Sequence, residues 1–341
     1  MNERYSRIAL FPPIGEKGVQ RLRRGSVLIV GAGALGGPVA EMLVRAGVGH
    51  IRLVDRDYVD WSNLQRQTLF NEDDARSMQP KAVAAGNYLS AANSEVQIEP
   101  IVSDVTKDNV REFLRDMDVI VDATDNFETR FLLNDAACEA GIPWIYGACI
   151  GAYGASLSIL PGETPCLVCL FGEDIPEQRE TCDTVGVIAP APQMVASYQA
   201  VEVLKLLTDN KETLRETFVS FDLWKNEHVE MKVKHKRKTT CPTCGEHPVY
   251  PYLSGQKGTS TSVLCGRDTV QIRLRNVREW DLEAVASGVR SIDDEALRNP
   301  HLISFHAEGH RLVVFKDGRV LVHHTNDTAT ARRLCAKYLG M

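Results

Sequence analysis

The sequence predicts an α/β fold followed by a small α+β domain, and three observations support this prediction. A run of branched apolar residues over 27–30, typical of a buried parallel strand, precedes a glycine-rich turn over 31–36 and a helix over 38–46. Strand-length and helical segments then alternate, as in a Rossmann-like nucleotide-binding sheet. From about Tyr250 the composition changes, and a hairpin is predicted around Asp317-Gly318.

The length and composition indicate a globular protein of two domains. A chain of 341 residues exceeds the usual single domain, and we expect domains over 1–248 and 249–341. The net charge of -6 argues against nucleic acid as the main partner. Because the apolar runs are only strand-length and the N-terminus has no apolar signal region, we expect no membrane span and a cytoplasmic location.

The remaining elements follow from apolar periodicity and from helix and turn signals. Residues 4–15 are expected to be irregular, and residues 172–184 to form a loop. We expect helices over 16–24, 80–92, 109–115, 190–207, 281–288 and 328–339, and strands over 51–54, 96–102, 118–123, 144–147, 156–160, 218–233 (a pair), 259–274 and 312–322 (the hairpin).

The glycine-rich turn, Gly31-Ala32-Gly33-Ala34-Leu35-Gly36, is typical of a site for nucleotide phosphates. Glycines allow a tight turn and a close backbone approach, and the following helix directs its free N–H groups at the anion. Asp55 ends the next strand about 20 residues further on, where a carboxylate can accept hydrogen bonds from a ribose. By itself this pattern favours a dinucleotide and hydride transfer.

The segment after Asp55 places a cation near the predicted ribose site. Ser62 and Gln65 match a capping box, so we expect a helix to begin at Asn63. Three residues apart on that helix, Asn63 and Arg66 share a face. A solvated helix start is the alternative, which the position directly after the ribose-binding strand makes less favourable.

Lys81 and Asp125 complete the predicted phosphate site. With Pro80 in the first position of its helix, Lys81 lies at the positive end of the dipole, at a cost of roughly a few tenths of a kcal/mol that a bound anion would offset. An exposed lysine is the alternative. Asp125 follows a strand that ends on the same edge of the sheet, and a carboxylate beside a phosphate needs a cation between them. Magnesium, held by one or two carboxylates and substrate phosphates, meets that need.

Four of the nine cysteines form two Cys-x-x-Cys pairs, Cys166 with Cys169 and Cys241 with Cys244. Each pair can supply two thiolates to tetrahedral zinc, and together they complete a four-cysteine structural site. An odd cysteine count in a chain without a signal region fits reduced thiols. Cys182 lies in a charged loop, where a thiol is accessible and available to react, although a cysteine more often serves only packing.

Two further segments have competing interpretations, and the C-terminal module offers no cluster that indicates a site. The small residues over Gly147–Gly154 could make room for an incoming chain or could serve close packing. The charge run over 234–238 is interpreted as a solvated linker because the whole chain is acidic.

Together these motifs favour attack at a phosphate, where cations stabilise charge on the phosphoryl oxygens, over hydride transfer. The chain also resembles the ThiF/MoeB/HesA family, bacterial relatives of the ubiquitin-activating enzymes, over about residues 1–245. The module after about residue 250 lies outside the family's shared core. The motifs that carry the resemblance are Arg4-Tyr5-Ser6-Arg7, the glycine-rich turn, Ser62-Asn63-Leu64-Gln65-Arg66-Gln67, Pro80-Lys81, Asp122-Ala123-Thr124-Asp125-Asn126 and both cysteine pairs.

The resemblance implies ATP-dependent adenylation of the C-terminal Gly-Gly carboxylate of a ubiquitin-like sulfur carrier, of the thiamin or the molybdopterin branch. Asp55 would hold the ribose, Arg66 and Lys81 the phosphates, and Asp125 the magnesium ion. Arg7 would come from the neighbouring subunit of a homodimer. The implied ATP-binding residues are Gly31, Gly33, Ala34, Gly36, Asp55, Asp57, Ser62, Asn63, Gln65, Arg66, Lys81, Asp125 and Asn126.

The resemblance also implies roles in sulfur transfer. Cys182 matches the loop cysteine that members of the thiamin branch can link covalently to the carrier. The carrier's tail would run over Gly147–Gly154, and a persulfide donor is a further partner that the sequence does not identify.

Two other functions remain open. An NAD-dependent oxidoreductase would keep the glycine-rich turn and Asp55 but would give no role to Arg66, Lys81 and the cysteine pairs; bound nicotinamide absorbance would support it. A non-catalytic, zinc-bearing scaffold would bind ATP weakly or not at all, which calorimetry with ATP and magnesium would reveal.

Overall fold

The computed structural model describes residues 3–173, 182–257, 263–264, 268–273 and 279–339. These residues form two compact units. The first contains residues 3–75, 80–173 and 186–257, and the second contains 76–79, 182–185 and the described residues from 263 onward. In the described part of the chain, no helix is both long enough and apolar enough to span a membrane.

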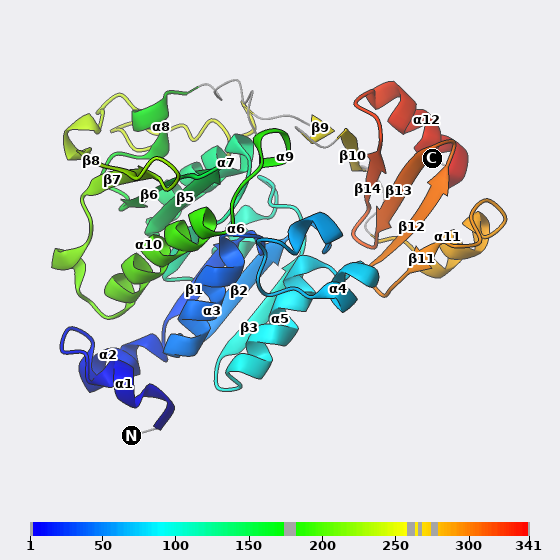
Figure 1. Cartoon of the computed structure of the whole chain (residues 1–341). Helices are drawn as coiled ribbons and strands as arrows, with labels where there is room; N and C mark the ends of the chain where they lie inside the picture. The colour runs from blue at the N-terminus through cyan, green and yellow to red at the C-terminus, as the bar shows by residue number, and fades with distance from the viewer. Residues whose placement is uncertain (1–2, 174–181, 258–262, 265–267, 274–278, 340–341) are drawn as a thin grey trace. The chain divides into compact units, whose positions relative to one another are not determined.

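An eight-stranded sheet lies at the centre of the first unit (Figure 1). Its strands are β1 (Ser26–Val30), β2 (His50–Asp55), β3 (Gln97–Val102), β4 (Val119–Asp122), β5 (Trp144–Ile150), β6 (Tyr153–Ile159), β7 (Thr217–Asp222) and β8 (Glu227–Lys232). In the order β3-β2-β1-β4-β5-β6-β7-β8, the strands from β3 to β5 are parallel and the last three are antiparallel. The predicted α/β fold with a mainly parallel sheet is therefore confirmed. Since the chain moves outward in opposite directions from β1 and β4, their carboxyl ends form the switch point where such sheets bind ligands.

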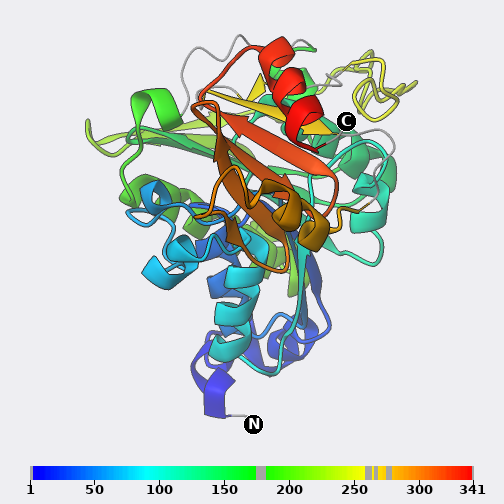
Figure 2. The same cartoon turned by 90° about the vertical axis from the view of Figure 1, so that its right-hand side faces the viewer.

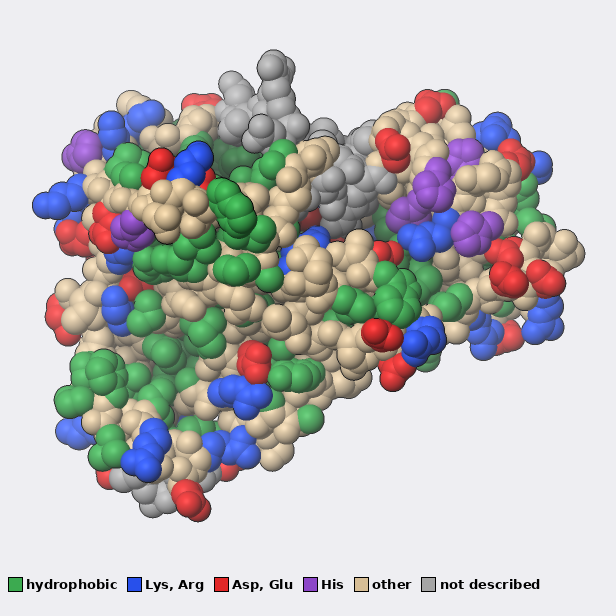
Figure 3. Space-filling view, viewed as in Figure 1, with side chains coloured by type: hydrophobic (Ala, Val, Ile, Leu, Met, Phe, Trp, Pro, Cys, Tyr) green, Lys and Arg blue, Asp and Glu red, His purple; other side chains and the backbone are tan. Residues whose placement is uncertain are grey.

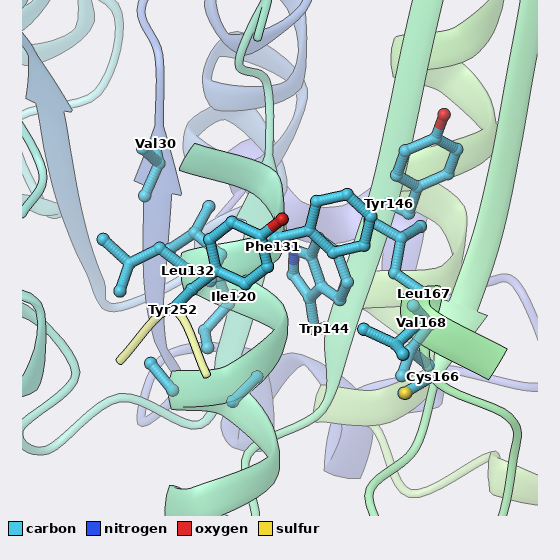
Figure 4. Close-up of a cluster of buried hydrophobic side chains, with 14 of the residues drawn as sticks. Val30, Ile120, Phe131, Leu132, Trp144, Tyr146, Cys166, Leu167, Val168 and Tyr252 are labelled. Carbon is cyan, nitrogen blue, oxygen red and sulfur yellow. The ribbon is translucent and has the colours of Figure 1, made fainter. Parts of the chain in front are cut away.

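Two layers of helices cover this sheet. One layer contains α3 (Gly36–Ala46), α5 (Lys81–Ala92) and α10 (Pro190–Leu207), and the other contains α6 (Val110–Phe113), α7 (Phe127–Ala140) and α8 (Leu167–Phe171). Successive strand side chains point to opposite faces, so Ile29 packs in the first layer and Val30 in the second. Figure 4 shows Val30 on the side of the sheet where Phe131 and Leu132 of α7 lie.

Several short elements complete the first unit or join the two units in sequence. One of them, α9, occupies the end of a segment that was predicted to be a loop. They are η2 (Trp61–Asn63), α4 (Glu72–Arg76), α9 (Cys182–Val185), η3 (Lys211–Thr213) and η4 (Lys234–Lys236).

Residues 3–9 are helical, which corrects the prediction of an irregular lead-in. They form η1 (Glu3–Tyr5) and α1 (Ser6–Ala9), and α2 (Gly15–Leu22) follows. Tyr5 is buried, and its hydroxyl accepts a hydrogen bond from Asn93 at 2.9 Å and donates one to Glu95 at 3.2 Å. Because Asn93 and Glu95 lie just before β3, this tertiary contact orders the segment at the amino ends of the strands.

An antiparallel six-stranded sheet forms the second unit, in the order β11-β12-β13-β14-β10-β9. Its elements are β9 (Val263–Leu264), β10 (Thr269–Arg273), α11 (Leu282–Val289), β11 (Leu297–Arg298), β12 (Leu302–Ala307), β13 (His310–Phe315), β14 (Arg319–His323) and α12 (Thr328–Leu339). Figure 2 shows α11 and α12 on one face of the sheet, where Leu282 and Leu334 share a core with Phe305. The predicted hairpin and final helix are confirmed, whereas β11 and β12 lie where no element was predicted.

Histidine side chains gather on the surface of this second unit (Figure 3). Five of the nine histidines of the chain lie between His301 and His324. Among the described residues, the one group of metal-ligating side chains close enough to share an ion is Cys166, Cys169, Cys241 and Cys244. The described histidines therefore give no indication of a metal site.

Candidate functional site

The turn after β1 is so tight that only glycine fits at two of its positions. Gly31 has a φ of +101°, and a Cβ atom there would lie 2.4 Å from the carbonyl oxygen of Ala123. A Cβ atom on Gly36 would lie 1.8 Å from the carbonyl oxygen of Gly31. The backbone of the turn and the start of α3 can therefore approach a phosphate closely.

Asp55 fixes this turn from the end of β2. Its Oδ2 accepts a hydrogen bond from the backbone N–H of Ala32 at 2.6 Å, and its Oδ1 accepts one from Asp57 at 2.7 Å. Burial raises the pKa of Asp55 above its ordinary value, and the Lys81 ammonium and these N–H groups oppose the rise. Each carboxylate oxygen has a second lone pair, so the side chain can bind a ribose hydroxyl while it holds the turn.

Lys81 begins α5 and lies beside Asp57. Its side chain is 5% exposed, with Nζ 3.6 Å from Asp57 Oδ2, and its backbone N–H donates to the Asp57 carbonyl at 2.9 Å. Pro80 has a ψ of 134° and is the N-cap, so the predicted helix start is one residue too early. The carboxylates of Asp55 and Asp57 already offset the dipole cost that the sequence interpretation left to a bound anion.

The segment after β2 is capped by Asp60 rather than by Ser62. Asp60 Oδ1 accepts a hydrogen bond from the N–H of Ser62 at 3.0 Å, and Asn63 Oδ1 accepts one from the N–H of Asp60 at 3.2 Å. The predicted capping box of Ser62 and Gln65 is therefore wrong, and the 3-10 turn η2 ends at Asn63, where a helix was expected to begin. A carboxylate is the stronger acceptor, and the Ser62 hydroxyl itself donates to Asp60 at 2.8 Å.

The next three residues contact different neighbours. Arg66 is half-buried, and its Nη1 donates to the carbonyl of Ser62 at 2.9 Å. Gln65 is exposed, and its Nε2 lies 3.4 Å from the Val187 carbonyl oxygen. Gln67 is 6% exposed, and a Cβ atom on Gly33 would lie 3.4 Å from its Nε2. No pattern of residue spacing in the sequence would have identified this buried amide, which adjoins the glycine-rich turn.

A buried ion pair shapes the end of β4. Asp122 Oδ1 accepts hydrogen bonds from the backbone N–H and the hydroxyl of Thr124 at 2.9 and 2.7 Å. Arg130 of α7 has its Nε 3.4 Å from Asp122 Oδ2. The Nη2 of Arg130 donates to the carbonyls of Thr124 and Gly147 at 2.6 and 3.2 Å. Burial raises the pKa of Asp122, and the Arg130 guanidinium opposes the rise.

Arg130 is absent from the residues predicted from the sequence. The sequence could have identified Arg130 by its position four residues after Asn126, which places it on the same face of α7 as that helix cap. Asn126 Oδ1 accepts the N–H of Thr129 at 2.9 Å. Asp125 is exposed beside it, and the Asn126 amide donates to Asp125 Oδ1 at 3.3 Å. The structure thus places Asp125 at the carboxyl end of β4, on the edge that holds Asp55.

A side chain of α10 joins a carbonyl at the end of β4 to a carbonyl near the start of β5. Gln199 is fully buried, and its Nε2 donates to the carbonyls of Asp122 and Ile145 at 2.6 and 3.0 Å. A Cβ atom on Gly147 would lie 2.5 Å from that nitrogen, and one on Gly154 would lie 2.3 Å from the ring of Phe221. Gly147 and Gly154 therefore serve close packing, which was one of the two interpretations of this segment.

The four cysteines of the predicted zinc site converge. Their sulfur atoms all lie within 4.8 Å of one another, with Cys166 and Cys241 at 3.5 Å and Cys169 and Cys244 at 3.4 Å. Tetrahedral zinc with bonds of about 2.3 Å to sulfur needs sulfur atoms about 3.8 Å apart, so the cluster fits that ion.

Residues of the charge run over 234–238 contact this cluster, so they are more than a solvated linker. The backbone N–H of Lys238 donates to the sulfur of Cys169 at 3.4 Å, and the guanidinium of Arg237 donates to the Cys244 carbonyl at 3.1 Å. Backbone N–H groups of this kind stabilise metal-bound thiolates.

For two of the predicted site residues, the described structure shows no side chain at the carboxyl edge of the sheet. Arg7 is exposed on α1, which lies at the amino ends of the strands and so at the opposite edge from Asp55. Cys182 begins α9, but its side chain lies outside the described part of the structure.

Comparison with known proteins agrees with this arrangement. The family model described as the ThiF family matches residues 5–243. The chain belongs to the ThiF family. That match covers the first unit up to the second cysteine pair, and it includes Asp55, Lys81 and Asp125.

Individual relatives extend the comparison. The sulfur carrier protein ThiS adenylyltransferase of Bacillus subtilis is 49% identical over 340 residues, which is 100% of each chain. A sulfur carrier protein adenylyltransferase of Thermus thermophilus is 38% identical over 253 residues, 72% of this chain and 92% of the relative. The crystal structure of E. coli MccB with ATP shares the fold, with a TM-score of 0.62 at 24% identity over 71% of this chain and 75% of that one.

Proposed function

We propose that this ThiF-family protein is an ATP-dependent adenylyltransferase that activates the C-terminal Gly-Gly carboxylate of a ubiquitin-like sulfur carrier. The observation that carries the proposal is the arrangement of Asp55, Asp57 and Lys81 beneath the glycine-rich turn. A buried ammonium held at a phosphate-binding turn stabilises charge on phosphoryl oxygens, which is what the transfer of an adenylyl group requires.

The reaction requires attack of a carboxylate oxygen on the α-phosphorus of ATP. A bond forms between that oxygen and phosphorus, the bond from the α-phosphorus to the bridging oxygen breaks, and pyrophosphate leaves with the electron pair. The product is an acyl-adenylate that a sulfur nucleophile can attack at the carbonyl carbon. Catalysis of this step consists mainly of positioning and charge stabilisation.

Each polar residue at the sheet edge has a part in this scheme. Asp55 binds the ribose, while Lys81 and Arg66 hold the phosphates. A magnesium ion, when bound, would neutralise phosphate charge, and the exposed carboxylate of Asp125 would hold it. The remaining residues of the proposed ATP site are Gly31, Gly33, Ala34, Gly36, Asp57, Ser62, Asn63, Gln65 and Asn126.

The extent of the matches supports a carrier of the thiamin branch over one of the molybdopterin branch. The ThiS adenylyltransferase aligns with the whole chain at 49% identity, whereas the relatives named adenylyltransferase and sulfurtransferase MOCS3 are 31–35% identical over 72–88% of it. A relative that aligns with the whole chain at the higher identity is the better guide to the substrate. In this proposal the adenylation domain extends beyond the expected boundary at residue 248, because residues 249–257 belong to the first unit, and the described residues from 263 onward form the second module.

The proposal also includes a homodimer and a thiol step. The family resemblance implies that Arg7 acts on the phosphates of a neighbouring subunit, and its position at the opposite edge of its own sheet from Asp55 is compatible with that role. The thiolate of Cys182 attacks the carbonyl carbon of the acyl-adenylate, so that a thioester forms and AMP leaves, or it attacks the outer sulfur of a persulfide donor, so that the persulfide moves to Cys182 and the donor's thiolate leaves. Zinc at the four cysteines is structural, since the four thiolates fill its coordination and leave no position for water.

Pyrophosphate exchange tests the proposed reaction. The protein is incubated with ATP, magnesium, labelled pyrophosphate and a ThiS-type or a MoaD-type carrier that ends in Gly-Gly. Label should enter ATP only with an intact carrier, and faster with the ThiS-type protein. The matched control is the same carrier without its last glycine. Exchange that is independent of the carrier, or absent with every carrier, would contradict the function.

A further inference from the structure

Two adjacent polar residues are buried in the middle of α7. Asn134 and Asp135 are both fully buried, and the helix around them is apolar, with Phe131, Leu133 and Ala136 in the core. A buried polar side chain is costly unless it forms hydrogen bonds. The partners of these two residues therefore indicate what the helix holds in place.

Each of the two side chains binds a different cysteine pair. Asn134 Oδ1 accepts a hydrogen bond from the backbone N–H of Leu167 at 2.8 Å, and Leu167 lies between Cys166 and Cys169. Asp135 Oδ1 accepts a hydrogen bond from the hydroxyl of Thr243 at 2.6 Å.

Thr243 lies between the two cysteines of the second pair, Cys241 and Cys244, and it is buried. Both contacts are thus made to the residues that connect metal ligands. One turn of one helix contacts both halves of the zinc site.

The chain beyond the second pair is held by the same helix. Asp135 Oδ2 accepts hydrogen bonds from the N–H groups of Tyr252 and Leu253 at 2.8 and 3.3 Å. The ring of Tyr252 stacks on Phe131, with centroids 5.0 Å apart and planes at 12°. Figure 4 shows Phe131 and Tyr252 together in the core that also contains Cys166.

We propose that Asn134 and Asp135 are positioning residues for the metal at the four-cysteine site. Within each pair the short turn sets the distance between the two sulfur atoms, but Cys166 and Cys241 are 75 residues apart in sequence. Bringing such distant segments together costs conformational entropy. Adjacent residues of a helix have a fixed separation, so the two anchors set the distance between the pairs before any metal binds.

The inference rests on the zinc centre of the proposed function, and its test measures zinc retention without carrier or ATP. Holoprotein is titrated with a coloured zinc chelator, and the chelator concentration that removes half of the metal is compared among variants. Asn134→Leu removes the acceptor for Leu167, and Thr243→Val removes the donor to Asp135, each with little change in side-chain volume.

Two control variants accompany these substitutions. Thr243→Ser keeps the hydroxyl and should behave like the wild type. Ser158→Ala removes another buried hydrogen bond, from the Ser158 hydroxyl to Glu202 at 2.8 Å, which lies on β6 and α10 and touches no cysteine. This variant reports a general loss of stability.

Removal of a side chain that orients metal ligands weakens metal binding by about 10- to 100-fold, so Asn134→Leu and Thr243→Val should release zinc at correspondingly lower chelator concentrations. Ser158→Ala and Thr243→Ser should retain it. Equal zinc retention in all variants, or equal weakening by Ser158→Ala, would overturn the positioning role. Wild-type protein without zinc would overturn the zinc centre itself, and pyrophosphate exchange tests the proposed reaction independently of both results.

Discussion

The two sheets of this protein group their charged residues differently. In the first unit, Asp55, Asp57 and Lys81 come from separate elements and meet at one edge of the sheet, where Lys81 is almost fully buried. In the second unit, the buried Arg319 pairs with Asp317, only two residues away, and Glu308 forms its hydrogen bonds on the surface, with Lys337 and Arg333 of α12.

Strand direction explains much of this difference. Parallel strands all end on the same edge, so residues that follow different strands are delivered to one place. Antiparallel strands end alternately on opposite edges, so their terminal residues are divided between two rims. A site made of single residues from several strand ends is therefore natural in the first unit and not in the second.

The largest expected effect is the loss of activity in Asp125→Asn. Removing one preorganised charge at a reacting phosphate costs on the order of a hundredfold to a thousandfold in rate. Pyrophosphate exchange measures the loss, and circular dichroism verifies the fold. Glu308→Gln is the matched change in the second unit and should leave exchange unaltered. Similar losses in both variants would remove the distinction between the two sheets.

Subunit mixing tests whether the catalytic site at the sheet edge is formed by one chain alone. Arg7→Ala and Asp125→Ala should each be nearly inactive alone. After random exchange, half of the dimers are mixed, and one of the two sites in each has both residues intact. Activity should then recover to about a quarter of the wild-type value. Tagged subunits verify the exchange, and an inactive mixture would show that Arg7 acts within its own chain.

The variant Cys244→Ser tests the zinc centre independently of the catalytic edge of the sheet. Metal analysis of the wild type should give about one zinc per chain, and the variant should lose both the metal and several degrees of thermal stability. Cys182→Ser, in the segment before α10, should keep the zinc. A stable, zinc-free wild type would show that the cysteine cluster has a different role.

The smallest expected effect is at Glu308. Hydrogen bonds from Lys337, Tyr338 and Arg333 lower the pKa of this carboxyl from 4.5 to about 2 in the folded protein. The pairing therefore adds stability that is complete above pH 4.5 and is lost as the pH falls through the folded pKa. Glu308→Gln should lower the melting temperature by roughly a degree or two at pH 7 and by less at pH 3. A pH-independent difference would point to packing instead.

Start and turn signals decided which elements were predicted more than apolar faces did. The helix over 190–207 begins with Pro190 in its first turn and the hairpin of the second unit turns at Asp317-Gly318, so both were placed correctly. The helix α7 was overlooked. Like the helix over 190–207 it is buried on most sides and has little contrast between faces, but it has no proline at its start.

Errors at the site came from competition between similar local signals. Ser62 and Asp60 are both good helix caps, and only the folded chain reveals that the carboxylate of Asp60 accepts the bond. The order of residues 3–9 depends on the contact of Tyr5 with Asn93, which is 88 residues away. Local patterns contain no information about such a partner.

Gln199 bridges the place in the first sheet where β4 and β5 stop pairing. β4 and β5 pair at only two positions, Ile120 with Trp144 and Val121 with Ile145, and beyond them the strands part. A parting sheet normally exposes carbonyl groups that must find water, but here one amide of α10 bonds to the carbonyls of Asp122 and Ile145. Because Gln199 is fully buried, these two carbonyls keep a hydrogen-bond partner within the protein at the place where the strands part, and they need no water molecule for it.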